Sequence, residues 1–104
     1  MAKFHDLGDR VRIFTSVPFT NVEGDTVDPD VVTFRIRYPD GESDQFVYES
    51  NPEVERSDAG SYYMDVNIDQ AGDWRYRIEG MADNEDYMGA AENSFVVRRS
   101  WVLD

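Results

Sequence analysis

The sequence of 104 residues contains no cysteine, one histidine and one lysine. Without cysteine, disulfides, zinc–thiolate sites and thiol nucleophiles are excluded. His5 is the single imidazole and lies near the first residue, so most metal sites and acid–base sites lack their usual side chain. The sequence also lacks a Gly-x-Ser-x-Gly element and a phosphate-binding loop. These absences favour a binding or structural protein over an enzyme, and we expect no cofactor.

Basic residues are scarce, with 10 Lys+Arg against 22 Asp+Glu and a formal net charge of -12. Nucleic-acid binding by phosphate neutralisation needs a basic stripe, and binding to anionic membranes needs a basic cluster. Long apolar runs are also absent, since nothing approaches the roughly 20 apolar residues of a membrane span or the apolar core of a secretory signal. We therefore expect neither nucleic acid nor membrane as a partner, and no signal peptide.

What the sequence does have is apolar residues at every second position, which is typical of strands with one buried face. No stretch shows a helical period of 3.6 residues. The pattern predicts an all-β fold, an immunoglobulin-like antiparallel β-sandwich of about six to seven strands, with a small barrel as the second choice. It forms one domain over residues 1–104, with its core at about 7–98. The alternating segments are 10–13, 32–38, 46–48, 62–68, 74–78 and 95–97, with a weaker one at 17–23 or 51–56.

Turn signals separate these segments every 8–12 residues, as in a sandwich. Tyr38–Gly41 has the Pro-Asp-Gly order of a tight turn, and Gly60 and Gly72 end two further turns in which a glycine can adopt positive φ. Trp74 lies in phase with the apolar positions of its segment, so we expect it in the core rather than on a sugar-binding surface.

Carboxylates cluster in the predicted loops, and oxygen clusters of this kind can bind calcium or perform acid–base chemistry. The weak cation candidates are Asp83, Glu85 and Asp86. Because 22 acids in 104 residues make such clusters frequent by chance, we interpret these clusters first as solvated loop charge and predict no metal site.

Eight of the nine arginines lie on or just after predicted strands, at outward positions. In immunoglobulin connectivity the first, second and fifth predicted strands would share a sheet. One outer face would then carry four arginines, with Tyr63 and Asp65 opposite them. These four arginines are Arg10, Arg12, Arg35 and Arg37. Two interpretations remain open, ordinary cross-strand ion pairs or a guanidinium-rich docking surface for an acidic partner.

Further contact candidates lie near the end of the chain. Tyr87 and Met88 fall in the long loop predicted over Gly80–Ala90, and the apolar tail carries Trp101, Val102 and Leu103. Trp101 either extends the last strand in phase with its apolar positions or belongs to an exposed tail that needs a partner.

Several segments resemble the second half of immunoglobulin-like domains, where a glycine turn leads into a strand with an aromatic residue. They are Gly60–Tyr62, Val66–Ile68 and Ala71–Gly80, and the likeness extends through Asp6–Asp9, Val27–Pro29, Tyr38–Gly41 and Ala90–Arg98. The whole is similar to small, stand-alone immunoglobulin-like proteins in the structural gene blocks of tailed viruses of bacteria and archaea. The cysteine pair of antibody domains is absent, so no antibody-type binding carries over. The family implies no catalytic residues.

This resemblance implies a non-enzymatic virion component, made in the host cytoplasm, that docks on the capsid surface or in the head–tail region. Its partners would be capsid, portal or connector subunits, bound in many copies through a sheet face, a strand edge or the chain termini as contact arms. A glycan- or cell-surface-binding module is the alternative, with Tyr87, Met88 and Trp101 as its contacts. An enzyme is the third possibility.

Overall fold

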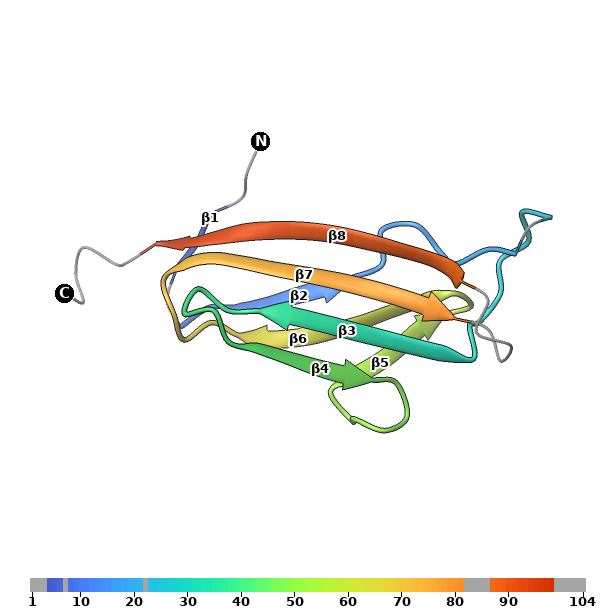
Figure 1. Cartoon of the computed structure of the whole chain (residues 1–104), viewed down its shortest axis with the longest axis horizontal. Helices are drawn as coiled ribbons and strands as arrows, with labels where there is room; N and C mark the ends of the chain where they lie inside the picture. The colour runs from blue at the N-terminus through green and yellow to red at the C-terminus, as the bar shows by residue number, and fades with distance from the viewer. Residues whose placement is uncertain (1–3, 7, 22, 82–86, 99–104) are drawn as a thin grey trace.

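The computed structural model describes residues 4–6, 8–21, 23–81 and 87–98, with the backbone alone at residues 4–6 and 87–88. It confirms an all-β sandwich (Figure 1). The described residues contain no helix, and therefore none long and apolar enough to cross a membrane.

The strands form two sheets, one of five strands in the order β1-β8-β7-β3-β4 and one of three in the order β2-β6-β5. β1 pairs with β8 in parallel, and every other pair is antiparallel. Successive stretches of chain alternate between the two sheets, which is immunoglobulin-like connectivity. The strands are β1 Phe4–Asp6, β2 Arg10–Phe14, β3 Val31–Arg37, β4 Ser43–Val47, β5 Val54–Asp58, β6 Ser61–Asn67, β7 Gly72–Met81 and β8 Tyr87–Arg98.

The core lies between the sheets and is built from the apolar positions of the period-two pattern. In β3, Val32, Phe34 and Ile36 are buried while Arg35 and Arg37 are exposed. Trp74 is buried with 1% of its surface exposed, which confirms its predicted inward position. Alternation predicted these strands because each sheet keeps one dry and one wet face.

Of the two alternatives for the weaker segment, the one near 51–56 is confirmed, since β5 covers Val54–Asp58. Residues 17–21 make only an isolated bridge between Thr20 and Thr26. Phe19 in this segment is nevertheless buried; its backbone N–H donates to Gly60 O, and its backbone oxygen accepts from the Val27 N–H. The segment therefore closes one end of the sandwich with a core side chain although it is not a strand.

Candidate functional site

The arginines expected on one face lie on two different sheets. Arg10 and Arg12 belong to β2 in the three-stranded sheet, whereas Arg35 and Arg37 belong to β3 in the five-stranded sheet. The prediction of one shared face was therefore wrong. The first predicted strand, β2, pairs with β6 in the other sheet. Of the three strands expected to share a sheet, only the second and the fifth, β3 and β7, do so.

On the three-stranded sheet, Arg12 has its predicted neighbours. Its Nε lies 2.8 Å from Asp65 Oδ1, and its guanidinium carbon lies 4.1 Å from the centre of the Tyr63 ring. The hydrogen bond from Arg12 lowers the pKa of Asp65, and Arg10 lies 3.8 Å from the same carboxylate. These contacts fit the interpretation as cross-strand pairing, in which the guanidinium of Arg12 already has a carboxylate and an aromatic partner.

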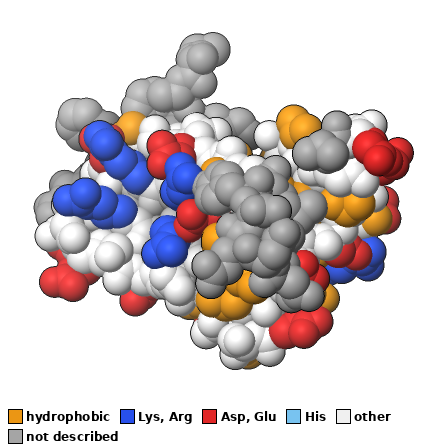
Figure 2. All heavy atoms as spheres, turned by 45° about the vertical axis from the view of Figure 1, so that its right-hand side comes forward, with side chains coloured by type: hydrophobic (Ala, Val, Ile, Leu, Met, Phe, Trp, Pro, Cys, Tyr) orange, Lys and Arg blue, Asp and Glu red, His pale blue; other side chains and the backbone are white. Residues whose placement is uncertain are grey.

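The outer face of the five-stranded sheet carries a block of four arginines. Arg35 lies opposite Arg77, and Arg37 lies opposite Arg75, in the register of β3 with β7. We call these four residues the arginine block. Figure 2 shows basic side chains gathered on the left of the view, with carboxylates among them, where this sheet turns its outer face. The sequence signal for Arg75 and Arg77 was their outward phase in the segment beside Trp74, but they were not among the candidate contacts.

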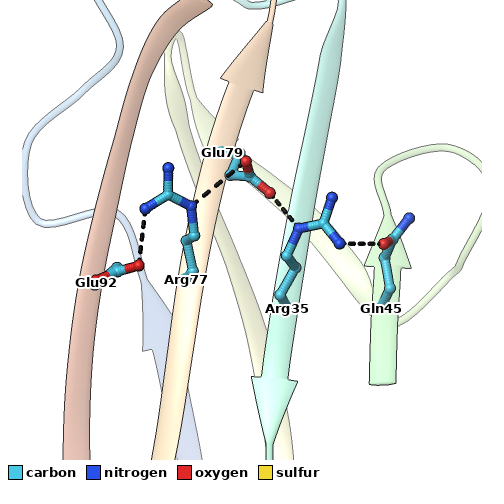
Figure 3. A network of polar contacts seen from close by, with 5 residues as sticks. All are labelled: Arg35, Gln45, Arg77, Glu79 and Glu92. Atoms are coloured by element: carbon cyan, nitrogen blue, oxygen red, sulfur yellow. Dashed lines mark hydrogen bonds and ion pairs between the residues drawn. The ribbon is translucent and has the colours of Figure 1, made fainter. Parts of the chain in front are cut away.

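One half of the arginine block is paired within the protein (Figure 3). Glu79 accepts a hydrogen bond from Arg35 and lies 3.4 Å from Arg77 Nε. Arg77 also donates to Glu92 at 2.8 Å, and Arg35 donates to Gln45 Oε1 at 2.6 Å. The hydrogen bond from Arg35 is the main reason that the pKa of Glu79 is lowered. Arg35 and Arg77 thus sit in a closed network across β8, β7, β3 and β4.

The other half differs. Arg37 and Arg75 are exposed and make no ion pair or hydrogen bond with a side chain in the described part of the chain. Both line a shallow hollow of about 690 Å³ over the sheet and a second of about 530 Å³ beside the turn at Pro39. The arginine block therefore combines an internally neutralised row with a row whose guanidinium groups remain available.

Asp28 is one of the loop carboxylates that we interpreted together from the sequence as solvated charge, but the structure gives it four contacts. Its carboxylate accepts hydrogen bonds from the Gly60 N–H at 2.8 Å, the Tyr62 hydroxyl at 3.1 Å and Arg56 Nε at 3.1 Å. Arg56 Nη2 lies 3.0 Å from its second oxygen. The hydrogen bond from Arg56, and after it the one from the Gly60 N–H, lowers the pKa of Asp28 to about 2. The pKa of Tyr62 is raised to about 12, mainly by burial and next by its hydrogen bond to Asp28. These contacts tie the loop before β3 to β5 and β6.

We expect Asp28→Asn to lower stability at neutral pH, with a difference from wild type that narrows as the pH falls from about 4 to about 2. The pKa of Asp28 is below its ordinary value of 3.8 in the folded protein, so its ionised form stabilises the fold above that value and protonation removes the effect. Urea unfolding of both proteins at pH 7, 4, 3 and 2 measures the difference. A constant difference down to pH 2 would contradict this role of the carboxylate.

Most side chains of the remaining contact and cation candidates lie outside the described part of the chain. The loop predicted over Gly80–Ala90 was too long, because β7 continues to Met81 and β8 begins at Tyr87. Tyr87 and Met88 therefore lie in β8, where only their backbone is described. The cation candidates Asp83, Glu85 and Asp86 and the tail residues Trp101, Val102 and Leu103 lie outside the described residues. Within the described residues, no group of three or more His, Cys, Asp or Glu side chains is placed to hold a metal ion.

Comparisons with known proteins support the fold alone. No protein-family model matches the chain, and no curated protein matches its sequence. A crystal structure from Bacteroides vulgatus, provisionally described as a glycoside hydrolase, is similar to 93% of this chain with a TM-score of 0.54 and 13% sequence identity. The match covers 16% of that protein, so the likeness is to one sandwich-sized part of a much longer chain.

Proposed function

We propose that this protein is a non-enzymatic structural module of a tailed-virus particle, which docks on the capsid surface or in the head–tail region. The observation that carries the docking surface is the arginine block, four guanidinium groups on one sheet face of a chain with a net charge of -12. Planar guanidinium groups bind carboxylates by paired hydrogen bonds and are enriched in protein interfaces. The resemblance of the sequence to virion immunoglobulin-like proteins supplies the location.

The form of the module suits attachment to a repeated surface. A sandwich with principal extents of 51 × 27 × 21 Å offers a small flat face, which by itself supports only modest affinity. Many copies on one particle would be retained by avidity when each domain contacts its neighbours or binds through more than one element. The glycan-binding alternative depends on Tyr87, Met88 and Trp101, whose side chains lie outside the described part, and nothing described favours it.

The test is co-sedimentation of the protein with tailed particles in a density gradient after expression in the infected host. We expect wild-type protein in the particle band and the double variant Arg35→Glu/Arg37→Glu in the soluble fraction, because charge reversal turns attraction for an acidic partner into repulsion. The matched control is Arg10→Glu/Arg12→Glu on the other sheet, which also breaks an Arg–carboxylate contact but leaves the arginine block intact. Melting curves confirm that both variants are folded. Wild-type protein that never enters the particle band would refute the proposal.

A further inference from the structure

We propose that Arg37 and Arg75, with Ser43 and Ser94 beside them, bind the side-chain carboxylates of an acidic segment of the partner protein. We call these four residues the donor row. The inference rests on the proposed docking function, and it narrows the whole arginine block to one row and names the partner chemistry.

The donor row is continuous across four strands. Ser94 lies opposite Arg75, Arg75 opposite Arg37, and Arg37 opposite Ser43, so the four side chains cross β8, β7, β3 and β4 in one line. A guanidinium group has five donors and no acceptor, and a serine hydroxyl can donate one hydrogen bond. The neighbouring row also has two arginines at its centre but a carboxylate and an amide at its ends, Glu92 and Gln45. Of these two described rows, the donor row is the one without a carboxylate or amide acceptor of its own.

This arrangement does not stabilise the free protein. Like charges directly opposite each other on neighbouring antiparallel strands repel, and their Cα atoms are only about 4.5–5.5 Å apart. The chain has 22 acidic residues and places Glu79 and Glu92 against Arg77, yet the described residues place no carboxylate in an ion pair with Arg37 or Arg75. An anion that bridges the two guanidinium groups would remove the repulsion and form charge-assisted hydrogen bonds with both.

The shape of the site favours a short, exposed ligand segment. Arg37 and Arg75 line both hollows, so they stand on the boundary between them and can be approached from either side. The larger hollow, of about 690 Å³, is also lined by Tyr76 and Asn93, and its volume leaves room for more than a bare carboxylate. A partner side chain that enters there can place its carboxylate between the two guanidinium groups.

Charge limits the ligand to a few negative groups. Asp73, two residues before Arg75 on the same exposed face of β7, borders the donor row on one side. Glu92 borders it on the other side, and Glu79 lies one row further, beyond Arg77. A nucleic acid carries a charge on every phosphate and would run across these carboxylates, in a protein whose net charge is already -12. One or two carboxylates from a protein segment fit the small positive area, as Glu79 and Glu92 already do in the adjacent row.

The experiment is an NMR titration of the full chain with a capped tetra-aspartate peptide at low salt, observing the arginine side-chain Nε–Hε signals. We expect the signals of Arg37 and Arg75 to shift and that of Arg12, which already binds Asp65, to stay in place. Arg37→Gln/Arg75→Gln should weaken the peptide affinity by about tenfold or more, since it removes both charged partners. The matched control Arg10→Gln/Arg12→Gln should stay within about twofold of wild type. Arg37→Lys/Arg75→Lys should lie between them, because lysine keeps the charge but not the paired donors.

A stability measurement separates binding from folding. Arg37→Gln/Arg75→Gln should leave the melting temperature unchanged or raise it by a few degrees, since it removes repulsion between like charges. A fall of several degrees would mean that the pair stabilises the fold and would overturn the proposal. Equal shifts at Arg12, or no shift at millimolar peptide, would overturn it as well. Tighter binding of inorganic phosphate or of a single-stranded DNA oligomer than of the peptide would refute a carboxylate partner.

The particle assay distinguishes this inference from the proposed function. If Arg37→Gln/Arg75→Gln still enters the particle band as fully as wild type does, the donor row is not the docking contact although the protein is a virion component. If wild type binds the peptide through Arg37 and Arg75 but never enters the particle band, the donor row stands and the virion function fails.

Discussion

Trp74→Ala is expected to lower the free energy of unfolding by about 3–5 kcal/mol, the usual result of truncating a large aromatic core residue to alanine. Trp74 has 1% of its surface exposed. Its ring packs edge-on against the ring of Tyr38, with 5.0 Å between the ring centres, and parallel to the ring of Phe95, with 5.7 Å between the ring centres. Its indole N–H donates to the backbone oxygen of Gln70 at 3.0 Å. Alanine would leave a cavity, two aromatic rings without their neighbour and a backbone oxygen without its donor.

Because domains of this size are stable by about 5–15 kcal/mol, the loss is large enough to leave a substantial unfolded fraction on mild heating. Urea unfolding measures it as a lower midpoint at an unchanged slope. Phe14→Ala is the matched control, since Phe14 is a large apolar residue on a strand but is 56% exposed, and surface substitutions usually change stability by about 0.5 kcal/mol or less. Equal losses in the two variants would contradict the core position of Trp74.

Trp74 also illustrates what local sequence can predict. Its position in the core followed from its phase with Tyr76 and Ile78, and the same period-two rule placed the buried residues of β3 and β6. Each residue in such a strand faces either the other sheet or water, so burial is encoded within a few residues of sequence. The turn at Tyr38–Gly41 is equally local, and Gly41 adopts a φ of 92° there.

Sheet membership is not encoded in this way. The alternation of Arg10 and Arg12 with apolar residues is the same as that of Arg35 and Arg37, yet β2 and β3 belong to opposite sheets. The pairing of a strand depends on contacts with distant segments of the chain, such as that of Arg12 with Asp65. Only the pairing of the strands in three dimensions therefore determines which arginines lie on the outer face of the same sheet.

The contacts of Asp28 could not be predicted from the sequence, for a related reason. Asp-Pro-Asp before a strand is a frequent turn signal, and nothing in those residues indicates a carboxylate that binds Arg56, Gly60 and Tyr62, which follow 28 to 34 residues later. The available signal was Gly60 itself. It ends a predicted turn, and a glycine with a positive φ often marks a place where backbone and other groups approach closely.

Gly60 carries the second large prediction, that Gly60→Ala lowers the free energy of unfolding by about 2–5 kcal/mol. Its φ of 71° costs an L-residue roughly 1–2 kcal/mol. A Cβ atom would also lie 2.9 Å from the Phe19 backbone oxygen and 3.0 Å from Thr26 Cγ2, and overpacking of this kind costs about 1–3 kcal/mol. Relief would require Phe19, whose side chain is buried and whose N–H donates to Gly60 O, to move away.

The matched control is Gly24→Ala, because Gly24 has a similar φ of 87° but no atom within 4 Å of the place that the new methyl group would occupy. It should show the backbone cost alone, about 1–2 kcal/mol. The difference between the two losses, measured by urea unfolding, then reports the close packing of Gly60 against the Phe19 segment. If Gly60→Ala costs no more than Gly24→Ala, the segment that carries Phe19 can shift without loss. Its closure of the sandwich end would then contribute little to stability, even though its side chain is buried.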